Sequence, residues 1–368
     1  MNNTIVEYRD ITAFHPGYYV AEIIEDMGIT HAEFAARMGT TSKTLSCLLN
    51  GQISLSNDLI RKLSTMLGSS VDFWLNLQAL YEEKLIQIEQ AKEYDDQARI
   101  ASLIDYSFFV KVADLPKTSI LADRVRNLCK YLVIADLRVL AKPDFLANYR
   151  SGINNSTISE KNVINARAWL QTALNFSKLI ETAPFNADRL RFYLPEIRKM
   201  TLQEPEDFIP RLQNIFAECG VAFVLLPHLK NSGINGVVKW VSPNRVVLAM
   251  NDRRAYADTF WFSLFHEIKH VLQQKTKTVF LNAGSKEMQE IDAKLEMEAD
   301  EFAQNYLIPA KDFRRFSPTK YTTDAQIIQF AKSIGIHPGV VAGRLQHDGI
   351  IAANRCASLK QKYKIILC

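Results

Sequence analysis

Cysteine is scarce and unpaired in this sequence of 368 residues. The five cysteines never form a CxxC pair and are odd in number (Cys47, Cys129, Cys219, Cys356, Cys368), which argues against a disulfide framework. There is no run of apolar residues long enough to span a membrane. The first residues, MNNTIVEYRDITAFHPG, also lack the basic stretch and apolar core of a secretory signal. We therefore expect a reduced, cytoplasmic protein with no membrane partner.

Low-complexity tracts and a strong net charge are absent as well. Hydrophobic residues make up 48% of the chain and charged residues 23%, which is typical of folded globular proteins and excludes a disordered chain. The net charge of +4 is too small to indicate a partner. A single core rarely grows beyond roughly 250–300 residues, so the length predicts two or three domains.

The charge is unevenly distributed along the chain. Residues 1–80 contain five Lys/Arg and eight Asp/Glu, a net charge of −3, whereas residues 121–200 contain thirteen basic and seven acidic residues, a net charge of +6. The front of the chain is therefore acidic and the middle is basic.

The periodicity of apolar residues predicts a multidomain, mainly α protein. Residues 1–90 show short amphipathic helices separated by tight breaks, which indicates an all-α helix-turn-helix domain. A helical linker region follows over 91–205. Residues 206–315 predict an α+β domain with a small sheet, because 221–226, 236–241 and 245–250 are rich in β-branched residues. Two helices, 258–274 and 285–307, come next, and a helical segment covers 316–368.

The sharpest motif is HExxH, formed by His266, Glu267 and His270. On a helix, positions i and i+4 lie on one face, so both imidazoles can reach one metal ion. Glu267 lies where it can accept a proton from the water molecule that a catalytic zinc activates. The motif therefore predicts a zinc-dependent hydrolytic site with Glu267 as the catalytic base.

A catalytic zinc needs a third protein ligand, and the helix over 285–307 offers two carboxylates at helical spacing, Glu296 and Asp300. One of them can ligate the metal while the other holds a histidine by its second ring nitrogen. We assign Glu296 as the ligand beside His266 and His270, and Asp300 as the residue that orients a histidine. Two histidines, one carboxylate and an open position are typical of a catalytic rather than a structural zinc. Two alternatives stay open: surface histidines without a metal, and a metal site that binds without cleaving.

Residues 29–46 have the layout of a helix-turn-helix. A short helix with the small Ala35 is followed by a turn at Gly39 and by a second helix that begins with hydroxyl residues. We expect the second helix to face the major groove of double-stranded DNA and His31 to lie near a phosphate. The groove-facing residues are predicted to be Thr41, Ser42, Lys43, Thr44 and Ser46. The net charge of −3 speaks against strong phosphate binding, so a protein-interaction domain remains the alternative.

Together these motifs resemble HigA-type (Xre family) antitoxin regulators that carry a C-terminal ImmA/IrrE-like metallopeptidase domain. The resemblance rests on His15-Pro16-Gly17, on LLNG at 48–51 and on DFWLNLQ at 72–78 in the first part. In the second part it rests on HExxH, on EMEADEFA at 296–303 and on IHPGVVAGRL at 336–345. It covers nearly the whole chain.

The resemblance implies an Xre-type DNA-binding fold and a minimal zincin (gluzincin-like) domain, with zinc bound by His266, His270 and Glu296. It further implies a transcription regulator, dimeric, acting on an operator, with a toxin or a repressor protein as a partner. Two departures from the family pattern stand out: Lys269 where relatives often have Gly, and Cys47 where they often have a basic residue. If the site cleaves peptides, Tyr256 and Tyr306 are candidates for stabilising the oxyanion.

Overall fold

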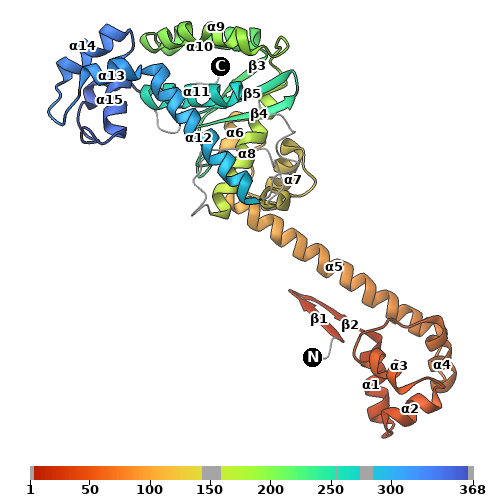
Figure 1. Cartoon of the computed structure of the whole chain (residues 1–368). Helices are drawn as coiled ribbons and strands as arrows, with labels where there is room; N and C mark the ends of the chain where they lie inside the picture. The colour runs from red at the N-terminus through yellow and green to blue at the C-terminus, as the bar shows by residue number, and fades with distance from the viewer. Residues whose placement is uncertain (1–3, 143–158, 253–255, 274–284, 364–368) are drawn as a thin grey trace. The chain divides into compact units, whose positions relative to one another are not determined.

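A computed structural model describes residues 4–142, 159–252, 256–273 and 285–363. The chain divides into two compact units, Met1–Arg99 and Ile100–Cys368, and each is described by itself. The first unit contains β1 (Ile5–Tyr8), β2 (Ile11–Phe14), α1 (Pro16–Asp26), α2 (His31–Arg37), α3 (Ser42–Leu49), α4 (Asn57–Leu67) and most of α5 (Val71–Leu103) (Figure 1).

The second unit begins within α5 and contains the remaining elements. These are α6 (Tyr106–Val112), α7 (Leu121–Leu132), η1 (Leu137–Ala141), α8 (Glu160–Ser177), α9 (Ala187–Lys199), η2 (Met200–Leu202), α10 (Pro205–Glu218), β3 (Val221–Leu225), β4 (Gly236–Ser242), β5 (Arg245–Met250), α11 (Ala257–Leu272), α12 (Ser285–Leu307), α13 (Ala310–Phe316), α14 (Asp324–Ile334), α15 (Pro338–His347) and η3 (Ala357–Leu359). The predicted mainly α architecture with a small sheet near the C-terminus is confirmed. Within the described residues, no helix is both long and apolar enough to cross a lipid bilayer.

The helices of the first unit enclose one core, and the His-Pro-Gly motif fixes how its first helix begins. His15 is the N-cap of α1: its Nδ1 accepts a hydrogen bond from the backbone N–H of Gly17 at 2.9 Å. Gly17 lies against α3 so closely that a Cβ at this position would be 1.9 Å from the carbonyl oxygen of Leu48. The motif therefore combines a cap with a helix crossing that only glycine allows.

The later DFWLNLQ motif anchors the start of α5 to the same core. Trp74 is fully buried, and its Nε1 donates to the hydroxyl of Ser69 at 2.7 Å. Gln78 accepts the backbone N–H of Leu55 at 3.0 Å, so that a buried backbone donor is satisfied.

The structure adds a β-hairpin that the sequence reasoning missed. Strands β1 and β2 pair in antiparallel fashion, and the hydroxyl of Tyr8 donates to Asp95 on α5 at 2.6 Å. The expectation of an all-α first domain is therefore correct for its helices but wrong for residues 5–14. The strands are only four residues long, too short for alternation of polar and apolar residues to stand out from the background.

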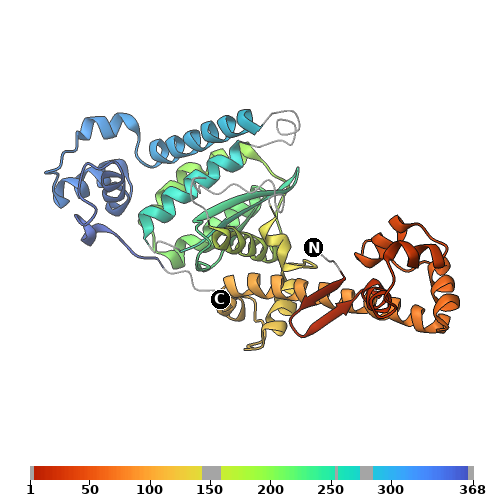
Figure 2. The same ribbon diagram turned by 90° about the horizontal axis from the view of Figure 1, so that it is seen from below.

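The three strands predicted near the C-terminus are confirmed, and they form one sheet in the order β3-β5-β4. β5 runs parallel to β3 and antiparallel to β4. Alternate residues of β5 face opposite sides: Val246 and Leu248 join one core, Val247 and Ala249 the other. The first core contains α10 and α11, and the second contains α8. In Figures 1 and 2 the sheet accordingly lies between α11 and α8.

The helices of the middle region are thus part of the same unit as the sheet. The side chain of Trp169, on α8, is fully buried and its Nε1 donates to the carbonyl of Pro227 just after β3. Arg245 at the start of β5 donates to the carbonyls of Ser177 and Ile180 at the end of α8. These long-range contacts pack α8 against the sheet, an arrangement that sequence periodicity alone could not predict.

Helices α14 and α15 repeat the spacing of α2 and α3. Ala331, Gly335 and Val341 are separated by the same four and six residues as Ala35, Gly39 and Leu45. Both glycines adopt a left-handed conformation, with φ of 65° and 67°. The difference lies in the second helix: α15 buries Val340, Val341, Ala342 and Leu345 and packs on α11, whereas α3 leaves its first residues exposed.

Candidate metal centre and DNA-binding surface

The HExxH motif lies on α11, which buries one face against the sheet. Trp261, Leu264, Phe265 and Ile268 are fully buried in the core beside the sheet. His266 and His270 are one turn apart on the flank of α11 that faces α12, and they retain 13% and 12% side-chain exposure. Packing of the apolar face thus aims both imidazoles at α12.

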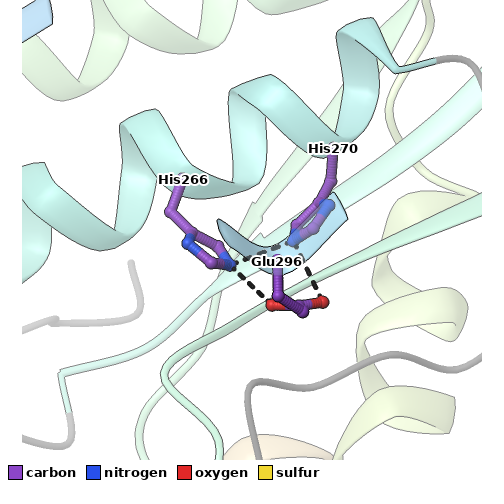
Figure 3. Close-up of side chains that lie close together, drawn as sticks. All are labelled: His266, His270 and Glu296. Atoms are coloured by element: carbon purple, nitrogen blue, oxygen red, sulfur yellow. Dashed lines mark hydrogen bonds and ion pairs between the residues drawn. The ribbon is translucent and has the colours of Figure 1, made fainter. Parts of the chain in front are cut away.

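Glu296 on α12 completes the cluster (Figure 3). Its two carboxylate oxygens lie 3.3 Å from Nε2 of His266 and 3.4 Å from Nε2 of His270. The two Nε2 atoms are 3.0 Å apart. Among the described residues, this is the group of three whose ligand atoms lie close enough together to hold a metal ion.

The distances within the cluster suit a small tetrahedral ion. Zinc bonds to His nitrogen and carboxylate oxygen are about 2.0–2.1 Å long, so neighbouring ligand atoms around it are about 3.3 Å apart. The two Nε2 atoms are 3.0 Å apart, and the carboxylate oxygen nearest to each lies at 3.3 Å (Oε2, from His266) and 3.4 Å (Oε1, from His270). With one atom taken from each residue, the three ligand atoms lie within 4.8 Å of one another. The donor set of two imidazoles and one carboxylate therefore fits a zinc-type ion in geometry and in chemistry.

Burial and hydrogen bonds within the cluster shift the pKa values of His266 and Glu296. Burial acts to lower the pKa of His266, but its hydrogen bonds to Asp300 and Glu296 outweigh burial and raise that pKa to about 10. Burial acts to raise the pKa of Glu296, yet the two imidazoles hold it well below its ordinary value. The carboxylate is thus kept ionised, the form in which it can bind a cation.

Each histidine is oriented by a second partner on its other ring nitrogen. Nδ1 of His266 lies 2.8 Å from Oδ1 of Asp300, and Nδ1 of His270 lies 2.9 Å from Oε1 of Gln273. Gln273 in turn donates to the carbonyl of Leu295 on α12 at 3.1 Å. The sequence reasoning missed Gln273, although its position three residues after His270 on one helix was a usable signal.

Glu267 points toward the sheet rather than into solvent. It is 6% exposed, and burial raises the pKa of its carboxyl group. A Cβ on Gly236, the first residue of β4, would lie 2.8 Å from Cγ of Glu267. The absence of a side chain at residue 236 thus leaves the space that Glu267 occupies.

Within the described residues, neither tyrosine singled out in the sequence forms a hydrogen bond or a ring contact with the cluster. Tyr256 precedes His266 by ten residues, which is about 15 Å along a helix axis, and its ring lies under Lys360 and Lys362. Tyr306 stacks on Phe265 at 5.2 Å. Lys269, where the family pattern often has Gly, lies 3.6 Å from Glu298 and over the ring of Phe302. Its charge is thus directed at α12.

The predicted DNA-facing residues lie at the front of α3 and at the start of α2. Thr41 is the N-cap of α3, and its hydroxyl accepts the backbone N–H of Thr44 at 3.0 Å. Ser42, Lys43 and Ser46 are exposed, opposite the buried Leu45, Leu48 and Leu49. His31 is also exposed and begins α2.

Most cations of residues 1–80 are engaged with carboxylates. Arg9 pairs with Asp95, Arg37 with Glu33, and both Arg61 and Lys62 with Asp58. Lys43 is the exception: no described carboxylate lies within ion-pairing distance of it. A single free cation therefore marks the exposed face of α3.

Comparison with known proteins identifies a domain in each unit. A family described as helix-turn-helix matches residues 20–74, and one described as the IrrE N-terminal-like domain matches residues 224–346. The HTH-type transcriptional regulator YddM of Escherichia coli is 32% identical over 89 residues, which cover 24% of this chain and 89% of that protein.

Two further relatives match the front of the chain. Antitoxin HigA-1 of Vibrio cholerae is 42% identical over 57 residues, covering 16% of this chain and 53% of the antitoxin. A solved structure of an antidote protein of a plasmid maintenance system from Nostoc punctiforme is 32% identical. It covers 23% of this chain and 92% of that chain, with a TM-score of 0.22. The chain thus spans about half the length of the antitoxin that it matches.

Proposed function

Since the chain belongs to the helix-turn-helix transcriptional regulators and carries an IrrE N-terminal-like domain, we propose that it is a DNA-binding regulator with a zinc-dependent, peptidase-type centre. The observation that carries the second half of this proposal is the cluster of His266, His270 and Glu296, whose ligand atoms all lie within 4.8 Å of one another. These three residues would hold the zinc. When bound, zinc supplies a Lewis acid that lowers the pKa of water and polarises a carbonyl group.

The residues around the cluster supply the rest of a hydrolytic site. Glu267 acts as the general base, and burial strengthens it as a base by raising its pKa. Asp300 and Gln273 hold the two imidazoles in a fixed orientation. Strand β4 lies at the edge of the sheet in the described residues, so an extended peptide can add to it beside Glu267.

A second candidate function is metal sensing without cleavage. Glu267 is 6% exposed and the side chains of both histidines are less than 15% exposed. Such burial leaves little room for a substrate and favours a site whose occupancy changes the stability of the unit. In that case the second unit would report a metal or a partner protein to the first.

The DNA-binding half of the proposal rests on the exposed front of α3. The major groove of an operator would be faced by Thr41, Ser42, Lys43, Thr44 and Ser46, and His31 would lie near a phosphate. The protein would act in the cytoplasm, where its DNA is.

Two protein partners belong to the same proposal. Phe73 and Leu80 lie seven residues apart on one face of α5 and are 47% and 51% exposed, and a second copy of the chain would cover them in a homodimer. The likeness to an antitoxin suggests a toxin or a repressor protein as the other partner.

Within the two compact units we retain four functional segments: residues 1–90, 91–205, 206–315 and 316–368.

The metal centre is tested by elemental analysis of protein purified without added metal. We expect one zinc per wild-type chain and none in His266→Ala. Glu267→Gln should keep its zinc. If this variant no longer regulates transcription, the result would support hydrolysis. If it regulates transcription as the wild type does, the result would support the sensing function. Wild-type protein without zinc, even after zinc is supplied, would refute the metal centre.

The DNA-binding half is tested by titrating the full chain with the duplex upstream of its own gene and with a random-sequence duplex. The double variant Lys43→Ala, Thr44→Ala should lose the preference for the upstream duplex. Lys92→Ala, at an exposed position of α5, is the control and should keep it. If the double variant retains the full preference, α3 is not the reading helix.

A further inference from the structure

Four unpaired cations lie close together in sequence on α13 and the turn that follows it. Residues 309–323 contain four basic residues and one acidic residue. Lys311, Arg314 and Arg315 are exposed, as is Lys320 in the turn, and no described carboxylate lies within ion-pairing distance of any of the four. They form, with Tyr321, a surface that we call the basic platform.

The platform follows from how α13 packs. Positions 311, 314 and 315 share one face of the helix at spacings of three and four, whereas Phe313 and Phe316 point to the core. The ring of Phe316 stacks on Phe330 of α14 at 4.2 Å with an interplanar angle of 1°. Burial of the two phenylalanines therefore forces the three cations outward.

The turn after α13 is held in place as well. The guanidinium of Arg355 donates to the carbonyls of Lys320 and Thr322 at 2.5 and 3.0 Å. Thr322 is 6% exposed, and its hydroxyl accepts the backbone N–H of Thr319 at 2.8 Å. Tyr321 projects from this turn with 75% exposure, and the ammonium group of Lys320 lies 5.1 Å from its ring. An aromatic ring and four cations are thus presented on a fixed backbone.

We propose that the basic platform binds the phosphate backbone of DNA, independently of sequence. Unpaired Lys and Arg side chains supply most of the non-specific affinity for a duplex, because each one that meets a phosphate releases a counterion. Residues 1–80 carry a net charge of −3, and in their described part Lys43 is the one Lys or Arg without an ion-paired carboxylate. These residues offer too few free cations to supply this affinity alone. The platform provides this affinity on the same chain. Once the platform holds the duplex, binding by α3 becomes an intramolecular second step.

This inference rests on the proposed DNA-binding function, and the experiment separates the two. The full chain is titrated with a random-sequence duplex over a range of sodium chloride concentrations. In the variant with Lys311, Arg314, Arg315 and Lys320 all changed to Gln, we expect affinity to fall by roughly tenfold or more. The slope of log K against log salt should also become shallower by up to about 3.6, since each phosphate contact contributes about 0.9.

The matched control changes four other exposed cations of the second unit to Gln: Lys117, Lys130, Lys178 and Lys199. It removes the same charge and should leave the slope close to that of the wild type. A variant with Lys311 and Lys320 changed to Arg should retain binding. Equal losses in the platform variant and the control, or no loss in either, would overturn the proposal.

Two other outcomes are informative. If the platform variant loses binding to phosphatidylglycerol vesicles but keeps its slope on DNA, the platform is a membrane-binding surface and the proposal is wrong. If random-sequence binding depends on the platform while the wild type shows no preference for its upstream duplex, the platform proposal stands and the operator-reading function fails.

Discussion

The carboxylate of Asp300 lies 2.8 Å from Nδ1 of His266, while the Nε2 atom of the same ring faces Glu296 at 3.3 Å. The imidazole is thus held from both sides by two carboxylates one turn apart on α12. In the neutral ring this contact favours the proton on Nδ1, so that Nε2 is the nitrogen that would bind a metal.

Replacing Asp300 by Asn should therefore weaken zinc binding without abolishing it. Partners of this kind are worth about 10–100-fold in metal affinity, and Asp300 is itself half exposed. A competition titration against a chelator measures the change. Glu301→Gln, an exposed neighbour on α12, should bind zinc like the wild type. Unchanged affinity in Asp300→Asn would show that the contact does not orient the ligand.

Gly236→Ala should strain the contact between β4 and Glu267. The added methyl group would meet Cγ of Glu267 at 2.8 Å and the sulfur of Met250 at 2.7 Å, and overpacking of this kind costs about 1–3 kcal/mol. Urea unfolding measures the loss. In a Glu267→Ala background the same change should cost at least about 0.5 kcal/mol less, because one of the two clashes is gone. Additive losses would place the strain elsewhere.

The first unit should lose stability in mild acid because His15 must be neutral to accept the N–H of Gly17. Burial lowers the pKa of His15 below its ordinary value of 6.5, so the unfolded chain takes up the proton more readily. The contribution is complete above about pH 6.5 and is lost as the pH falls through the lower folded pKa, at up to about 1.4 kcal/mol per pH unit.

Hydrogen exchange of residues 15–67, corrected for the intrinsic pH dependence of exchange, measures this loss. In His15→Asn, which retains a capping acceptor, the pH dependence should largely disappear. His31→Asn removes an exposed histidine of the same unit and should leave the dependence as in the wild type. An identical pH profile for His15→Asn and the wild type would contradict the capping argument.

Arg198→Met should destabilise the second unit by about 2–4 kcal/mol. The half-buried guanidinium donates to the carbonyls of Tyr306, Leu307 and Ile334, which end α12 and α14 and would lose their donor. Arg198→Lys should recover only part of the loss, because an ammonium group lacks the planar fork. Urea unfolding provides the measurement, with the exposed neighbour Lys199→Met as control. A cost below that of Lys199→Met would rule out this role.

The sequence predicted much of the local structure because local signals determine it. The turn at Gly39, the helix with hydroxyl residues at its start that follows this turn, and the helix 285–307 follow from apolar spacing and capping residues within a few positions. The grouping of His266, His270 and Glu296 was also within reach, since HExxH and a later glutamate at helical spacing restrict the geometry strongly. That this group binds zinc stays a prediction.

Other features depend on contacts between distant segments. The place of α8 against the sheet rests on pairs such as Trp169 with Pro227, 58 residues apart. The hairpin of residues 5–14 is stabilised by Asp95, far along the chain. That Lys43 lacks an ion-pair partner, whereas the other cations of residues 1–80 have one, depends on which carboxylates the fold brings close to each cation. None of these follows from periodicity, because each depends on the folded arrangement of several elements.

The repeated spacing of α2–α3 and α14–α15 bears on how such proteins are recognised from sequence. A search for the alanine–glycine–aliphatic signature would count two DNA readers in this chain. Because α15 packs its apolar face against α11, the helix that carries the HExxH motif, of these two hairpins it is the first whose second helix keeps a face exposed that could enter a groove. The signature therefore specifies a helix–turn–helix connection. Whether the second helix can bind DNA or instead supports the core depends on the elements that pack against it.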